Sequence, residues 1–294
     1  STRGVARALC GTYIMPTIYG TGTAALTNTV PVANYRAPGG APGTYVLERI
    51  IDMAARKAGI DPAEIRRKNH IPADAMPYTL PTGASYDSGE FTALMDKCLK
   101  QADYDGVDAR KADAKKRGTL YGVGISSTVD PSAGPGPETA ELRFDPSGTV
   151  TVLVGSTAGG QSHATIYTQI VSHHLGIDAD TISVVEGDTS RLSWGTGTGA
   201  ARTATIAGSA VFKSTEKIIA KGKRIAAHLM EASLDDISFE DGTFKVDGTN
   251  RSIDFTEVAQ AAFKPGKMPD DLELGLFETA TWSPEVNNIP NSCH

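Results

Sequence analysis

The sequence has few cysteines and no long apolar run. Its 294 residues include only Cys10, Cys98 and Cys293, which lie far apart and form no C-x-x-C pair. This spacing excludes a disulfide framework, predicts neither a zinc nor an iron–sulfur site, and favours a reducing compartment. The longest aliphatic run, residues 150–154, is far below the ~18 residues that a membrane span needs. We therefore expect no segment to cross a bilayer.

The composition is that of a globular protein with many tight turns. Hydrophobic residues make up 40% of the chain and there are 31 glycines, which excludes disorder and collagen. The formal charge is +4 over residues 1–117 and −10 over residues 118–294. The two basic runs, 66–68 and 111–117, are typical of solvated helix faces. We therefore expect no nucleic-acid partner.

Helical patterns dominate the first half of the chain. Apolar residues recur on one helix face over 44–57, and Asp61 followed by Pro62 predicts the N-cap and first position of a helix that reaches Asn69. Further helices are predicted over 90–102 and 106–117. The periodicity changes at Gly118, and we place a domain boundary there, between lobes 1–117 and 118–294.

Strands and helices mix in the second half. The pattern predicts an antiparallel meander of strands 121–126, 139–144 and 149–154, because a turn sequence separates the last two. A helix over 161–175, a strand over 181–186, a long helix over 203–232 and a strand over 272–282 follow. This order has no βαβ repeat, so it favours an α+β fold of two lobes, with small mixed or antiparallel sheets and packed helices.

Three Gly-rich loops, 37–43, 155–162 and 195–199, run directly into predicted helix starts. A helix N-terminus has unpaired N–H groups and the positive end of the helix dipole, and glycine lets a ligand approach the backbone. One such loop alone is more often a simple turn. Three loops flanked by polar side chains predict a large anionic ligand. Those side chains belong to Arg36, Gln161, His163, Thr165, Arg202 and Thr203.

No standard nucleotide motif accounts for these loops. The sequence has no G-x-x-x-x-G-K-[ST], no G-x-G-x-x-G that opens a helix after a strand, and no G-x-S-x-G. Six segments instead resemble, in order, the molybdenum-binding large subunit of the xanthine dehydrogenase and carbon monoxide dehydrogenase family, the molybdenum hydroxylases. These segments are residues 34–39, 45–49, 59–69, 160–165, 186–189 and 195–202. The resemblance covers most of residues 25–285, so the chain resembles a part of such a subunit.

The resemblance implies a pterin molybdenum cofactor in its cytosine dinucleotide form, with the metal bound by the pterin dithiolene and no protein side chain as a direct ligand. It places three groups of residues around that cofactor. Beside the molybdenum it places Arg36, Ala37, Pro38 and Gly39. On the pterin and phosphates it places Gly160, Gln161, Ser162, His163 and Thr165. On the far side of the dinucleotide it places Thr198, Gly199, Ala200, Ala201, Arg202 and Thr203.

The chain departs from the family pattern at three places. Ser162 replaces the usual glycine, and Ala200-Ala201 replaces a Gly-Ser pair, so one hydroxyl contact is missing or is transferred to Thr203. Ala37 stands where copper-containing carbon monoxide dehydrogenases have a cysteine, and alanine cannot bind copper. Oxidation of carbon monoxide is therefore not expected.

The family also has an upstream Gly-Phe loop and a downstream Gly-x-Gly-Glu general base that this sequence lacks. The resemblance therefore implies an oxidoreductase of aldehydes or N-heterocycles whose catalytic glutamate lies outside this chain, which is inactive alone. It implies an iron–sulfur subunit, an FAD subunit and the remainder of the large subunit as partners. It further implies a dimer of heterotrimers in the cytoplasm, with periplasmic export left open.

Two alternatives remain from the sequence alone. One is a non-catalytic cofactor-binding or scaffold subunit, and the other is an unrelated phosphate-binding domain. Other conspicuous residues have plainer interpretations. His70, His173, His174 and His228 are expected to be structural, capping or exposed, and Trp194 and Trp282 to be packing anchors. Asp188 fits either a turn or cofactor support.

Overall fold

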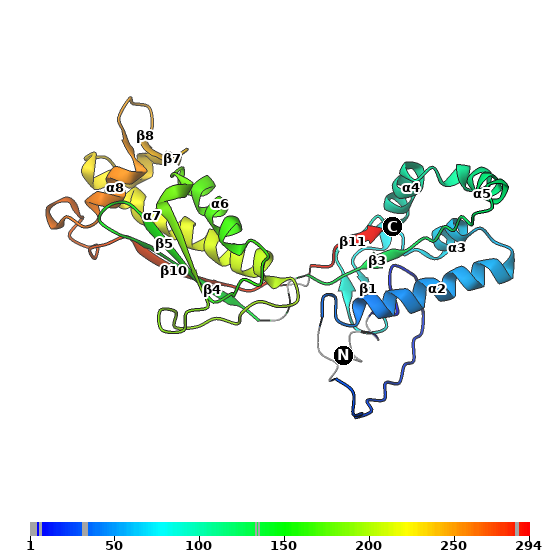
Figure 1. The fold of residues 1–294 in the computed structure, drawn as a ribbon. Helices are drawn as coiled ribbons and strands as arrows, with labels where there is room; N and C mark the ends of the chain where they lie inside the picture. The colour runs from blue at the N-terminus through cyan, green and yellow to red at the C-terminus, as the bar shows by residue number, and fades with distance from the viewer. Residues whose placement is uncertain (1–4, 6–7, 31–34, 133, 135, 286–287) are drawn as a thin grey trace. The chain divides into compact units, whose positions relative to one another are not determined.

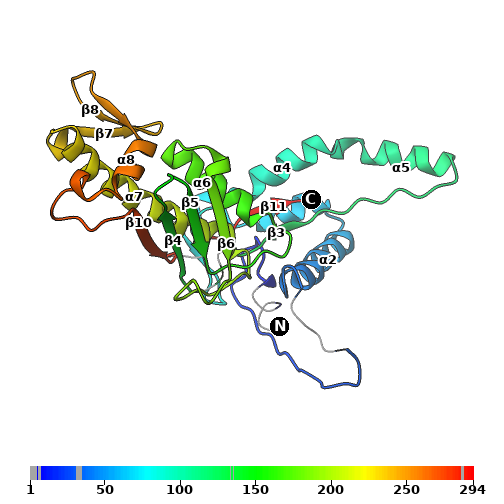
Figure 2. The same cartoon turned by 60° about the vertical axis from the view of Figure 1, so that its left-hand side comes forward.

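The computed structural model describes residues 5, 8–30, 35–132, 134, 136–285 and 288–294. Their contacts divide the chain into two compact units (Figures 1 and 2). Unit 1 comprises residues 1–132 and 287–294, and unit 2 comprises residues 133–286. Both units combine packed helices with small sheets, so the predicted α+β class is confirmed.

Unit 1 contains four helices and two short antiparallel strand pairs among its described residues. The helices are α2 (Gly40–Ala58), α3 (Pro62–Asn69), α4 (Phe91–Gln101) and α5 (Val107–Lys116). The strands β1 (Tyr78–Thr79) and β2 (Ser85–Tyr86) form one pair, and β3 (Ser127–Val129) and β11 (Asn291–Cys293) form the other. All four predicted helices are present. The β3–β11 pair fixes the last residues of the chain to unit 1, as Figure 1 shows.

Local sequence signals define the ends of α2 and α3. The carboxylate of Asp61 accepts hydrogen bonds from the backbone N–H groups of Ala63 (2.8 Å) and Glu64 (3.2 Å), so it is the expected N-cap. Gly59 ends α2 with φ of 68°, the left-handed conformation that glycine adopts at helix ends.

A buried ion-pair network joins α2 to α3. Arg66 is fully buried, and its guanidinium lies 2.9 Å from carboxylate oxygens of both Glu48 and Asp52 on α2. Glu48 also accepts a 2.7 Å hydrogen bond from the Tyr13 hydroxyl. Burial raises the pKa of Glu48 although Tyr13 and Arg66 oppose the change. The expectation that residues 66–68 form a solvated face is therefore wrong at Arg66, because its charge is paired inside the unit.

The outer face of α2 is apolar. Tyr45, Val46, Ile50 and Met53 are exposed, with 71%, 43%, 58% and 57% of their surfaces accessible. This helix thus buries Leu47 and Ala55 together with two carboxylates, and it leaves four large hydrophobic side chains exposed. Exposed apolar patches of this kind mark interaction surfaces.

His70 is buried rather than on the surface. It ends α3 as its C-cap residue, stacks on the Tyr13 ring at 5.2 Å and shares a 3.1 Å hydrogen bond with the Thr92 hydroxyl. Burial, with the nearby Arg66 charge, lowers the pKa of His70 to about 4. His70 is therefore a neutral core residue near neutral pH, which agrees with its expected capping role.

Unit 2 is built on a four-stranded sheet in the order β10-β4-β5-β6. Its strands are β4 (Glu138–Phe144), β5 (Val150–Val154), β6 (Ile182–Glu186) and β10 (Phe277–Trp282), and its long helices are α6 (His163–Leu175) and α7 (Gly208–Leu229). Strands β10, β4 and β5 pair antiparallel. Strands β5 and β6 are parallel because α6 connects them, and Figure 2 shows α6 alongside both.

Helix α7 packs along the sheet and against α6. A π-helical turn, Thr203–Ala207, precedes it. A smaller antiparallel sheet follows, made of β7 (Ile237–Glu240), β8 (Thr243–Val246) and β9 (Ser252–Asp254), with helix α8 (Phe255–Ala261) after it. A Cβ at Gly222 would lie 2.6 Å from the Phe244 ring. Gly222 within α7 therefore permits close packing of the helix against the smaller sheet.

The predicted meander is wrong at its first strand. Residues 121–126 form no strand, and the second neighbour of β4 is β10 instead. Leu120, Tyr121 and Val123 are exposed, whereas Ile125 packs against Met95 on α4. The alternating pattern therefore belongs to an extended segment of unit 1. Accordingly, the contacts divide the chain after Ser132 rather than at Gly118, and residues 287–294 return to unit 1.

In the described part of the chain, no helix combines the length and the apolar character of a membrane span.

The Arg66 network predicts a large difference between two adjacent arginines. Arg66→Ala leaves the buried Glu48 carboxylate without its counter-charge and Asp52 with only Arg56, and should destabilise unit 1 by about 3–5 kcal/mol. Arg67→Ala is the matched control, because Arg67 pairs with Asp96 at the surface and should cost about 1 kcal/mol or less. Hydrogen exchange of α2 and α3 measures unit 1, while Trp194 and Trp282 fluorescence measures unit 2. Equal losses in the two variants would contradict the network's importance.

Candidate functional site

Two of the three predicted Gly-rich loops meet in unit 2. The first follows β5 and leads into α6, and the second precedes the π-helical turn before α7. A Cβ at Gly155 would lie 2.5 Å from the Cα of Gly195, so only glycine permits this approach of the two backbones. Because β5 and β6 are parallel, their carboxyl ends meet at the same edge of the sheet, which is where open α/β sheets bind ligands.

Thr198 joins the two loops through its hydroxyl. Its Oγ1 accepts a 3.0 Å hydrogen bond from the backbone N–H of Thr157 in the first loop. The hydroxyl of Thr203 donates to the same oxygen at 3.2 Å. The loops over 155–162 and 195–203 therefore form one continuous structure, which we call the double loop.

A buried carboxylate under the double loop shapes its second half. Glu138, fully buried at the start of β4, accepts hydrogen bonds from the backbone N–H groups of Thr196 and Gly197 at 3.2–3.3 Å. Its Oε2 also lies 2.8 Å from Nη1 of Arg202. Arg202 donates further to three carbonyl oxygens, those of Gly136, Pro137 and Gly197. The Glu138–Arg202 pair thus binds both N–H and carbonyl groups of the second loop and fixes its conformation.

The Arg202 side chain is an internal support. Only 4% of Arg202 is exposed, and both of its terminal nitrogens are engaged with Glu138 and the carbonyls. Its Nε is buried and has no hydrogen-bond partner among the described residues. The structure therefore gives the guanidinium a positioning role, and its contact with the cofactor stays a prediction.

A second buried network supports the first half of the double loop. Glu186, at the end of β6, accepts a 2.7 Å hydrogen bond from Ser156 and lies 2.9 Å from Nδ1 of His163. The Ser156 hydroxyl also lies 2.7 Å from the hydroxyl of buried Tyr167. Burial, followed by the charge of Glu186, raises the pKa of Tyr167, so it stays protonated. His163 is 3% exposed, and this network holds its ring inward.

The start of α6 presents unsatisfied backbone N–H groups. Ser162 occupies the N-cap position with φ of 61°, and no side chain in the described residues caps the helix. Gln161, Ser162, Ala164 and Thr165 are exposed around it. Gln161 is not free, since its side chain accepts a hydrogen bond from the Gly159 N–H. An uncapped, exposed first turn is suited to an anion.

Open space lies beside several glycines of the double loop. A Cβ at Gly160, Gly197 or Gly199 would meet nothing within 4 Å. Ala200 and Ala201 are exposed and hold left-handed φ values of 48° and 54°, which are unfavourable for alanine. The exposed amides, the orphaned Arg202 Nε and this open space fit an elongated anionic group, such as a pterin dinucleotide.

The third predicted loop belongs to unit 1. Arg36 and Pro38 are exposed, Ala37 is partly exposed with φ of 51°, and Gly39 is buried as the N-cap of α2. The carbonyl of Ala37 already accepts the N–H groups of Gly40 and Ala41. Asn34, the first residue of that motif, lies outside the described residues. The predicted role of Arg36–Gly39 beside the metal remains a prediction.

Asp188 is engaged in a local turn. Its carboxylate accepts hydrogen bonds from the backbone N–H (3.0 Å) and hydroxyl (2.6 Å) of Ser190. These bonds hold the pKa of Asp188 below its usual value. Of the two interpretations left open by the sequence, this geometry favours turn formation.

The remaining conspicuous residues lie away from the double loop or contribute little to it. His173 and His228 are exposed, as expected, and His174 packs on the Phe212 ring at 4.4 Å. Trp282 packs against the core of unit 2. Trp194 is 45% exposed, so the expectation that it anchors packing is wrong.

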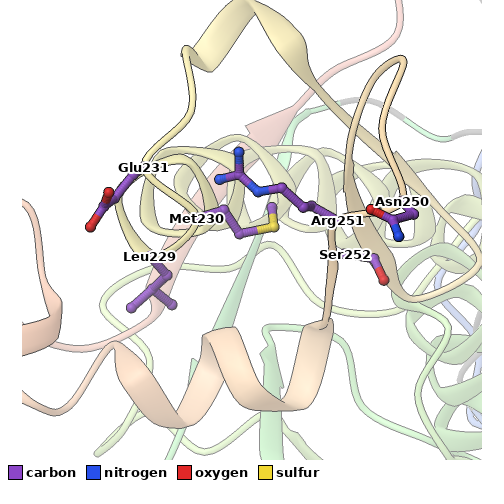
Figure 3. Close-up of a pocket in the computed structure, with 6 residues that line it drawn as sticks. All are labelled: Leu229, Met230, Glu231, Asn250, Arg251 and Ser252. Atoms are coloured by element: carbon purple, nitrogen blue, oxygen red, sulfur yellow. The ribbon is translucent and has the colours of Figure 1, made fainter.

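The surface depression shown in Figure 3 is separate from the double loop. It lies between the end of α7 and the turn before β9, with a volume of about 470 Å³. Met230 and Arg251 lie next to each other at its centre. None of the predicted site residues lines it. Within the described residues, no group of three His, Cys, Asp or Glu side chains could hold a metal ion.

The sequence interpretation missed the residues beneath the double loop. Glu138 and Tyr167 lie outside every predicted Gly-rich loop and every segment that carries the family resemblance, while Ser156 and Glu186 lie in the predicted stretches 155–162 and 186–189 but had no assigned role. One signal was available, because Glu186 is an acidic residue at the end of an otherwise uncharged strand. A buried carboxylate at such a position needs a specific partner.

Comparisons with known proteins agree on one family. Residues 97–293 and residues 2–70 each match a family model of the molybdopterin cofactor-binding domain. The chain is 35% identical over 262 residues to the carbon monoxide dehydrogenase large chain of Hydrogenophaga pseudoflava, covering 84% of this chain and 32% of that one. It is 32% identical over 299 residues to the nicotine 6-hydroxylase large subunit of Paenarthrobacter nicotinovorans, covering 97% and 36%.

The fold agrees as well. The quinoline 2-oxidoreductase of Pseudomonas putida 86 superposes on 99% of this chain and 39% of its own, with a TM-score of 0.89 and 29% identity. The chain thus spans about a third of the length of the curated relatives that it matches.

The geometry of the double loop predicts that two of its glycines tolerate substitution by alanine to different degrees. A Cβ at Gly195 would lie 2.6 Å from the Cα of Gly155, whereas one at Gly199 meets nothing within 4 Å. Gly195→Ala should therefore destabilise unit 2 by about 1–3 kcal/mol, since backbone must shift, and Gly199→Ala by less than about 1 kcal/mol. Urea unfolding followed by tryptophan fluorescence measures both. Similar midpoints for the two variants would show that the loops do not approach as described.

Proposed function

The chain belongs to the molybdopterin cofactor-binding domain family of molybdenum hydroxylases, and we propose that its double loop binds the pterin and phosphates of that cofactor. The observation that carries the proposal is the uncapped start of α6, held against the second Gly-rich loop by Thr198. Phosphate oxygens would accept hydrogen bonds from its free amides and be stabilised by the helix dipole.

The proposal gives the predicted residues distinct tasks. Gly160, Gln161, Ser162 and Thr165 would bind phosphate and pterin with amides and short polar side chains, because they are exposed. Thr198 to Ala201 would do the same from the second loop. His163, Arg202 and Thr203 are buried, so they would act mainly by holding the loops in place.

The bound cofactor would supply the redox chemistry, with its metal held by the pterin dithiolene. We propose the cytosine dinucleotide form of this cofactor, with Arg36 beside its metal. This chain's own residues would bind and orient the cofactor.

We propose an oxidoreductase that acts on an aldehyde or an N-heterocycle. Relatives named for nicotine hydroxylation and quinoline oxidation support the N-heterocycle class. Relatives named for carbon monoxide oxidation are equally similar in sequence, but Ala37 offers no thiolate for copper. The general base would be a glutamate supplied by another part of the large subunit, so this chain alone should not turn over substrate.

We further propose that this chain works within a larger cytoplasmic assembly. Iron–sulfur and FAD subunits would carry electrons away, in a dimer of heterotrimers. Relatives that are large chains or subunits of multi-subunit complexes support partner subunits in general. The apolar outer face of α2, with Tyr45, Ile50 and Met53, supports further contacts of unit 1. The family match favours this function over a non-catalytic scaffold, and it removes the unrelated phosphate-binding domain.

A matched pair of substitutions at Ser162 tests cofactor binding. Asp and Asn both tolerate the left-handed φ at this N-cap, and they differ by one negative charge. Ser162→Asp should cap the free amides and repel phosphate, lowering cofactor content at least about tenfold with unfolding stability unchanged or raised. Ser162→Asn should retain most of the cofactor. Molybdenum and pterin nucleotide per chain are measured after production in a host that makes the cofactor.

Three results of this experiment are decisive. Equal cofactor content in the Asp and Asn variants, with stability intact, would contradict binding at the start of α6. A cytidine nucleotide in the released pterin would support the dinucleotide form, and an adenine nucleotide would overturn the assignment. Loss of cofactor from both variants together with lower unfolding stability would mean that Ser162 itself is needed for the fold.

A further inference from the structure

Two thiols that are distant in sequence meet in unit 1. Cys98 lies on α4 and Cys293 on β11, and the Cys98 thiol donates a hydrogen bond to the backbone carbonyl of Cys293 at 3.5 Å. Cys98 also acts on the pKa of the Cys293 thiol, as expected of neighbouring side chains. Helix α4 packs against β11, so this contact belongs to the packing of the unit. The third cysteine, Cys10, is fully buried in a different apolar cluster.

The surroundings of the pair keep the Cys293 thiol protonated near neutral pH without burying it fully. Both cysteines are partly exposed. Cys293 packs beside Met95 and Leu99, and the Ser127 hydroxyl lies 3.9 Å from its sulfur. Burial, and then the neighbouring Cys98, raises the pKa of Cys293 to about 11. Few Cys293 side chains are therefore thiolates near neutral pH, and their reaction is slow rather than blocked.

From this geometry we infer that Cys98 and Cys293 form a dithiol modification site, which a small-molecule disulfide such as oxidised glutathione converts to an intramolecular disulfide. The Cys98 thiolate attacks one sulfur of the oxidant, forming a mixed disulfide and releasing one thiol. The Cys293 thiolate then attacks the Cys98 sulfur and releases the second thiol. Two protein thiols lose two electrons and two protons, and one oxidant disulfide is reduced to two thiols.

The bond would fasten the last strand of unit 1 to a helix. Strand β11 is held by three residue pairs with β3, the pairs Asn291–Val129, Ser292–Thr128 and Cys293–Ser127. A Cys98–Cys293 bond closes a loop of nearly 200 residues, and long closed loops constrain an unfolded chain most. Oxidation would therefore restrict opening of residues 288–294 from α4.

Oxidation of the full chain with glutathione disulfide tests the site. The wild type and Cys10→Ser should each lose two hydrogens in mass, and digestion should give one cross-linked peptide pair containing Cys98 and Cys293. Cys98→Ser and Cys293→Ser should stop at a mixed disulfide. Between pH 7 and pH 9 the rate of cross-linking should rise about tenfold per pH unit, because the second step needs the Cys293 thiolate.

Two further measurements make the outcome decisive. Hydrogen exchange of residues 288–294 should slow at least about fivefold on oxidation of the wild type and should not change in Cys98→Ser. Phenylarsine oxide, which bridges adjacent thiols, should bind the reduced wild type one to one and neither single variant. A cross-link through Cys10, or a full count of free thiols together with no arsenical binding, would overturn the site. None of these results depends on cofactor binding.

Discussion

The double loop depends on one buried ion pair, that between Glu138 and Arg202. Each partner alone would be an uncompensated charge in the interior of unit 2, so neither tolerates loss of the other. Together they satisfy two amides and one carbonyl of the loop over 195–199, and the carbonyls of Gly136 and Pro137 beside it. A Gly-rich loop without such support would sample many conformations, because glycine has the largest backbone entropy. The pair therefore makes an otherwise flexible segment a defined surface.

Unit 1 also contains a buried arginine that is paired with carboxylates. Arg66 is buried between Glu48 and Asp52, and it fixes α2, whose first residue follows the Arg36–Gly39 loop. In both units a buried arginine is thus paired with carboxylates and not directed at solvent. Arginine suits this task because its planar guanidinium donates several hydrogen bonds in fixed directions.

The exposed part of the double loop is in a less favourable local conformation than the buried residues beneath it. The first turn of α6 has no side-chain cap, and Ser162, Ala200 and Ala201 hold left-handed backbone conformations. Such conformations cost of order 1–3 kcal/mol each for residues other than glycine and concentrate at functional sites. Among the described residues of unit 2, the double loop thus holds three of the five non-glycine residues with left-handed φ, together with free amides. This distribution is expected where a ligand completes the structure.

The sequence predicted the helices and the Gly-rich loops, but it did not predict the role of the buried residues that support the loops. Amphipathic periodicity located all four helices of unit 1, and Asp61-Pro62 located the start of α3. The Gly-rich loops were visible because glycine and polar residues cluster there. The supporting roles of Glu138 and Glu186 were not predicted, because their partners Arg202 and His163 are distant in sequence and only the folded sheet brings them together. The meander failed since the alternating residues 121–126 pair with no strand, and alternation alone does not specify a partner.

The central claim is that the two loops of unit 2 form a single anion-binding surface. Hydrogen exchange with and without inorganic pyrophosphate tests it most directly, because the backbone amides themselves are the proposed ligands. The account predicts that pyrophosphate slows exchange in residues 158–165 and residues 197–203 together, with the same concentration dependence. Protection of only one loop, or of neither, would contradict it.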